Sequence, residues 1–177
     1  MNFDLKINDF IEKIKNIIKG NQLNFYISND EFYEYILEFF GDKEFIVKNY
    51  RDIINSLKNE DFFSFYYFTE KIYFYFCKNY LLCLEINQYN CHKFKNQIYT
   101  GINIMILLLE LNRYIRKVNK VDRKITFYPS GNPKIQKEEN KLNILSYLIN
   151  SLNYIDSNNF VKIIDNHLSG AILTNAD

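Results

Sequence analysis

The clearest functional pattern in this sequence is a run of basic residues between positions 113 and 124. Five of them follow the spacing i, i+3, i+4, i+7 and i+11, namely Arg113, Arg116, Lys117, Lys120 and Lys124, with Arg123 beside them. If one helix carries them all, they form a positive stripe along its C-terminal end. Such a stripe could dock nucleic acid or an acidic protein surface. Cations also stabilise helix C-termini through the helix dipole, so a purely structural role stays open.

Two aromatic residues follow this stripe directly. Phe127 and Tyr128 lie in a segment that also holds both prolines of the chain, Pro129 and Pro133. Aromatic rings beside a basic surface can stack on exposed bases. The sequence therefore predicts one anion- or partner-binding region formed by the basic stripe together with Phe127 and Tyr128.

Groups suited to catalysis or metal binding are sparse. The chain has three cysteines, Cys77, Cys83 and Cys91, and two histidines, His92 and His167, without any CxxC pair. Zinc needs about four such ligands at suitable spacing, and adjacent helical residues such as Cys91 and His92 point in different directions. No histidine follows any of the four arginines by four to seven residues. We therefore predict no catalytic residue, no metal and no cofactor, with an enzyme that uses an unrecognised site as the second alternative.

Carboxylates recur on one predicted helix face. Glu31, Glu34 and Glu38 are spaced i, i+3 and i+7, with Asp30 and Asp42 at either end. Acid–base chemistry would require burial to shift a pKa, and Mg²⁺ would require carboxylates converging from another segment. The sequence offers neither, so this face is predicted to be solvated.

Helical periodicity dominates the elements that must position these residues. Apolar spacing and capping residues predict helices at about 5–19, from the Ser28 capping box to Gly41, from Asp42 to about Leu57, at about 60–86, 91–120 and 138–154, and from Asp156 or Ser157 to about Leu168. Only 5 Gly and 2 Pro occur, too few for the turns of an all-β protein.

The segment 62–76 holds ten aromatic residues in fifteen positions. They fall all round a helix, which predicts contacts on several sides. A single strand would be too short for this run, so the helical interpretation is preferred. Tyr66, Tyr67, Tyr73 and Tyr75 cannot all be core residues on this pattern.

Together these elements predict an all-α, single-domain bundle of six or seven helices. It is built around a hairpin of two long helices, at 60–86 and 91–120, with one Pro/Gly loop near 126–134. Residues 1–170 form the domain, and 171–177 form a frayed tail. A composition of 47% hydrophobic and 24% charged residues is ordinary for a globular chain.

Charge and hydropathy bear on the partners and the location of the protein. Residues 1–90 carry ten basic and fourteen acidic residues, and residues 91–177 carry twelve and seven, so the halves differ in sign within a net charge of +1. No apolar run reaches the ~20 residues of a membrane span, and acidic residues near the N-terminus argue against a signal peptide. We expect a cytoplasmic protein.

The leading functional hypothesis is a non-enzymatic macromolecule-binding protein. It would dock a helical surface onto a protein partner as an inhibitor, immunity or scaffold factor, with surface Tyr and Arg side chains as anchors. The first alternative is a nucleic-acid-binding accessory protein that uses the basic stripe. The oligomeric state stays open, and the aromatic content is compatible with self-association.

Overall fold

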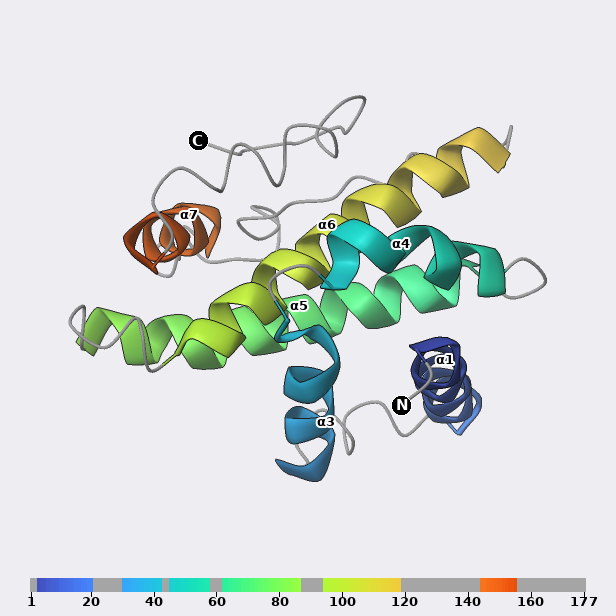
Figure 1. Ribbon diagram of the computed structural model, residues 1–177, viewed down its shortest axis with the longest axis horizontal. Coiled ribbons are helices and arrows are strands. Elements are labelled where there is room, and N and C mark those ends of the chain that lie inside the picture. Colours follow the sequence, from blue (N-terminus) through green and yellow to red (C-terminus); the bar gives the residue numbers. More distant parts are fainter. Residues whose placement is uncertain are drawn as a thin grey trace.

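The computed structural model describes residues 3–20, 30–42, 45–57, 62–86, 94–118 and 144–155 (Figure 1). Within these ranges the chain forms six helices and no strand, which confirms the predicted all-α class for them. The helices are α1 (Phe3–Lys19), α3 (Asp30–Phe40), α4 (Phe45–Ser56), α5 (Phe62–Ile86), α6 (Lys95–Val118) and α7 (Ile144–Ile155).

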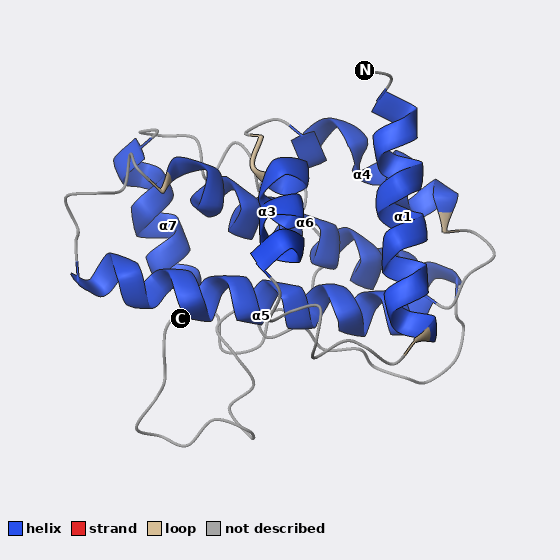
Figure 2. Cartoon of the chain, turned by 90° about the horizontal axis from the view of Figure 1, so that it is seen from below, coloured by secondary structure: helices blue, strands red, loops and turns tan. Residues whose placement is uncertain are grey.

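The two longest helices, α5 and α6, pack along each other more extensively than any other pair. They run in opposite directions, since the ring of Phe62 at the start of α5 lies 4.9 Å from the ring of Tyr114 near the end of α6. Helix α4 covers α6, and α1 and α7 cross the long pair steeply, as Figures 1 and 2 show from two directions. Helix α6 therefore has neighbours on several sides.

Burial follows the apolar periodicity of each shorter helix. In α1 the buried side chains recur at helical spacing, as Ile7, Phe10, Ile11, Ile14 and Ile17. In α3 they are Phe32, Ile36, Phe39 and Phe40. Both helices end at a glycine, as predicted. The N–H of Gly20 donates to Asn16 at 3.0 Å, and that of Gly41 donates to Leu37 at 2.8 Å.

Aromatic contacts join α1, α3 and α5. Phe10 stacks on Phe39 at 4.2 Å between ring centroids, and Phe32 meets Phe68 of α5 edge-on at 6.3 Å. At the rim, the hydroxyl of Tyr35 donates to Asp9 at 3.3 Å, and the ammonium of Lys13 lies 3.9 Å from the Tyr35 ring. Burial, and then the Asp9 carboxylate, raise the pKa of the Tyr35 hydroxyl. This tyrosine therefore stays neutral and fastens α1 to α3.

Helix α6 is buried without interruption from Ile98 to Asn112. A helix buried on all sides must satisfy its polar side chains inside the protein. Asn103 does so by donating through Nδ2 to the carbonyls of Phe40 and Asp42, both at 2.6 Å. A single side chain of α6 thus holds the end of α3.

Gly41 lies between Phe40 and Asp42, whose carbonyls accept the hydrogen bonds from Asn103. A Cβ there would collide with the carbonyl oxygen of Leu37 and would lie 3.2 Å from the Cβ of Asn96. The absence of a side chain at position 41 therefore lets the end of α3 approach α6 closely.

Several predicted features lie outside the described residues. They are the Ser28 cap, the loop near 126–134, the seventh helix at 157–168 and the tail 171–177. The helix predicted at 91–120 is described from Lys95 to Val118, and the one predicted at 138–154 from Ile144 to Ile155. Among the helices that the structure describes, none is long and apolar enough to cross a membrane.

Candidate functional site

The structure places three members of the predicted basic stripe in the last turns of α6. These are Arg113, Arg116 and Lys117. The other five predicted site residues lie outside the described residues, namely Lys120, Arg123, Lys124, Phe127 and Tyr128. The described residues therefore bring together only the N-terminal half of the stripe.

Arg113 is engaged within the protein. Its Nη1 donates to Oε1 of Glu110 at 2.9 Å, and the two side chains are 34% and 6% exposed. A buried carboxylate needs such a partner, because removing one member of a buried pair leaves an uncompensated charge. Glu110 and Arg113 are spaced i, i+3, a spacing that supports ion pairs on a helix and was the signal available in the sequence. Sequence reasoning missed this pair.

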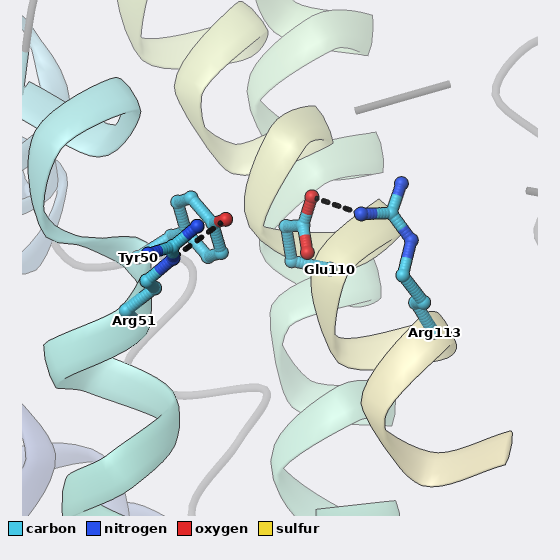
Figure 3. A network of polar contacts seen from close by, with 4 residues as sticks. All are labelled: Tyr50, Arg51, Glu110 and Arg113. Carbon is cyan, nitrogen blue, oxygen red and sulfur yellow. Dashed lines mark hydrogen bonds and ion pairs between the residues drawn. The ribbon is translucent and has the colours of Figure 1, made fainter. Parts of the chain in front are cut away.

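A second arginine approaches the same carboxylate from α4. Figure 3 shows Tyr50 and Arg51 of α4 on one side of Glu110 and Arg113 on the other. The Nε of Arg51 donates to the Tyr50 hydroxyl at 3.1 Å, and its guanidinium carbon lies 5.8 Å from the Tyr50 ring centroid. The bond to Tyr50 raises the pKa of Arg51, and Glu110 adds a smaller effect in the same direction. Glu110 is thus an internal anion that offsets nearby positive charge.

The remaining positive charge of the described stripe is limited. Lys117 is exposed, whereas Arg113 and Arg116 are only partly exposed, and the Nε atoms of both arginines are buried. An exposed cation contributes fully to phosphate contacts, and a cation engaged in an internal pair contributes less. Within the described residues, the surface is therefore less basic than the sequence alone suggests.

Helix α5 presents a different kind of surface. Tyr66 and Tyr73 are buried, Tyr75 is intermediate, and Tyr67 is 54% exposed. The four tyrosines are therefore not all in the core, as expected. Tyr67 and Val118 are the exposed large apolar side chains of the described residues.

Tyr67 belongs to a row of side chains that runs along α5. We call this row the α5 stripe; its members are spaced i, i+4, i+7 and i+11 and are Phe63, Tyr67, Glu70 and Phe74. Phe63 and Phe74 are partly buried and pack against the core. The stripe therefore combines one exposed ring with one partly exposed carboxylate, and exposed Lys71 lies four residues after Tyr67, next to the ring on the helix surface.

Glu70 has an unusual environment for a carboxylate. Burial raises its pKa from 4.5 to about 7. No hydrogen bond or ion pair joins it to a residue that the structure describes. Glu70 therefore exchanges its proton near neutral pH, as a desolvated carboxylate without a countercharge does.

Tyr66 lies one turn before Glu70 on the same helix. Its hydroxyl is buried and forms no hydrogen bond with a described residue. The side chain of Asn112 on α6 lies close enough to lower the pKa of the Tyr66 hydroxyl slightly. Burial, and then the Glu70 carboxylate, raise that pKa far more strongly. The Tyr66 hydroxyl is therefore neutral.

Of the other candidates from the sequence, the acidic face of α3 lies among the described residues. Glu31, Glu34 and Glu38 are all exposed, which fits a solvated face. Cys91, His92 and His167 lie outside the described residues. In the part of the chain that the structure describes, no group of three or more His, Cys, Asp or Glu side chains could hold a metal ion.

Comparison with known proteins gives no relative: no protein-family model, curated protein or solved structure matches the chain.

Proposed function

We propose that the chain is a non-enzymatic macromolecule-binding protein that docks the α5 stripe onto a protein partner, as an inhibitor, immunity or scaffold factor. The observation that carries this proposal is the 54% exposure of Tyr67, whose neighbours in the sequence, Tyr66 and Phe68, are buried. Exposed tyrosines on rigid elements are frequent anchors of protein interfaces, because they supply contact area with little loss of conformational entropy.

We also propose that the chain acts in the cytoplasm as a single domain of residues 1–170. In this domain α5 and α6 form the hairpin at the centre of a helical bundle. In such a bundle the outer side of α5 is fixed by the packing of its inner side, so the partner meets a preformed surface. Preformed surfaces bind with a smaller loss of entropy than segments that order on binding.

The nucleic-acid alternative has less support among the described residues. The ion pair between Arg113 and Glu110 directs one cation of the stripe toward the protein itself. Exposed Lys117 still favours this alternative, so it is tested separately in the Discussion.

Site-specific photo-cross-linking tests the proposal. A benzophenone amino acid replaces Tyr67, and a second sample carries it at Asn153, an exposed position on α7. In extracts of the source cells, we expect position 67, and not position 153, to yield a discrete cross-linked protein. Excess unlabelled wild-type chain should abolish the product, and excess Tyr67→Ser variant should not.

Two results would contradict the proposal. One is equal cross-linking from positions 67 and 153, which would indicate non-specific contact. The other is a product of about twice the 21.4 kDa chain mass, which would assign the stripe to self-association instead.

A further inference from the structure

We draw no further inference here: the strongest candidate, the cluster of Arg51 and Arg113 on either side of buried Glu110 between α4 and α6, carries nothing beyond the site already described, because its guanidinium groups bond to Tyr50 and Glu110 within the protein and nothing in the described residues shows what would cover them.

Discussion

Helices α5 and α6 are of nearly equal length and lie side by side, but they treat their charged residues differently. The buried carboxylate of α6, Glu110, has an arginine at 2.9 Å. The partly buried carboxylate of α5, Glu70, has no pairing partner among the described residues. The pairing of Glu110 with Arg113 stabilises the fold, because a buried carboxylate without a cation would destabilise it. The second carboxylate, Glu70, is a partly buried charge that no described cation compensates, so the two carboxylates should affect the stability of the fold in opposite directions.

The largest expected effect comes from the interior of α6. Asn103→Ala removes the donor for the carbonyls of Phe40 and Asp42 and leaves both without this bond in a buried place. We expect a loss of about 3 kcal/mol in the free energy of unfolding, measured by urea denaturation. Asn153→Ala, at an exposed position of α7, should change it by less than about 0.5 kcal/mol. Equal effects would mean that Asn103 contributes no specific connection.

The ion pair on α6 should have the next largest effect. Arg113→Met leaves the buried carboxylate of Glu110 without its closest partner, so we expect a loss of about 2 kcal/mol in the free energy of unfolding. Combining it with Glu110→Leu should recover most of that loss, because no charge is then left buried. Lys117→Met, one turn further on, is the matched control. A double variant no more stable than Arg113→Met would show that the pair is not a unit.

On α5, removing the charge of a carboxylate should raise the free energy of unfolding instead of lowering it. The folded pKa of Glu70 lies above its ordinary value, so ionisation of this group opposes folding, beginning near pH 4.5 and reaching its full extent above pH 7. After allowance for partial exposure, Glu70→Gln should stabilise the protein by about 1–2 kcal/mol at pH 8, and by little at pH 4. Thermal unfolding at the two pH values, with Glu34→Gln as control, measures this difference. Destabilisation at pH 8 would mean that Glu70 has a stabilising partner.

The smallest expected effect concerns the basic end of α6. If the chain docks onto protein, labelled single-stranded RNA and DNA should bind weakly, and Lys117→Glu should change that binding less than twofold. A nucleic-acid site that neutralises five phosphates would instead give a log–log salt slope of roughly −3.5. Such a slope, flattened by reversing Lys117 and Lys120, would favour the nucleic-acid alternative.

The sequence predicted the features that depend on local periodicity. The aromatic segment 62–76 lies within α5, and the helix ends at Gly20 and Gly41 are as expected. These features follow from side-chain spacing and from glycine, both of which act over a few residues.

The candidate site depended on contacts that periodicity does not encode. Nothing in the spacing of the basic stripe indicates that Glu110 is buried on the side of α6 that faces Tyr50 and Arg51 of α4, about sixty residues earlier in the chain. The burial of Glu70 likewise depends on how α5 is covered. A signal was available, because Glu70 and Lys71 are the charged residues of the segment 62–76, but the sequence alone could not say which one is desolvated.

The connection from Asn103 to the end of α3 also has a consequence for how the molecule opens. Amide hydrogens near a surface turn usually exchange with solvent through small local fluctuations. Here the carbonyls of Phe40 and Asp42 are held by a side chain from the middle of the most buried helix. The last turn of α3 and the centre of α6 should therefore become accessible to solvent in the same cooperative event, and their amides should exchange at matching rates.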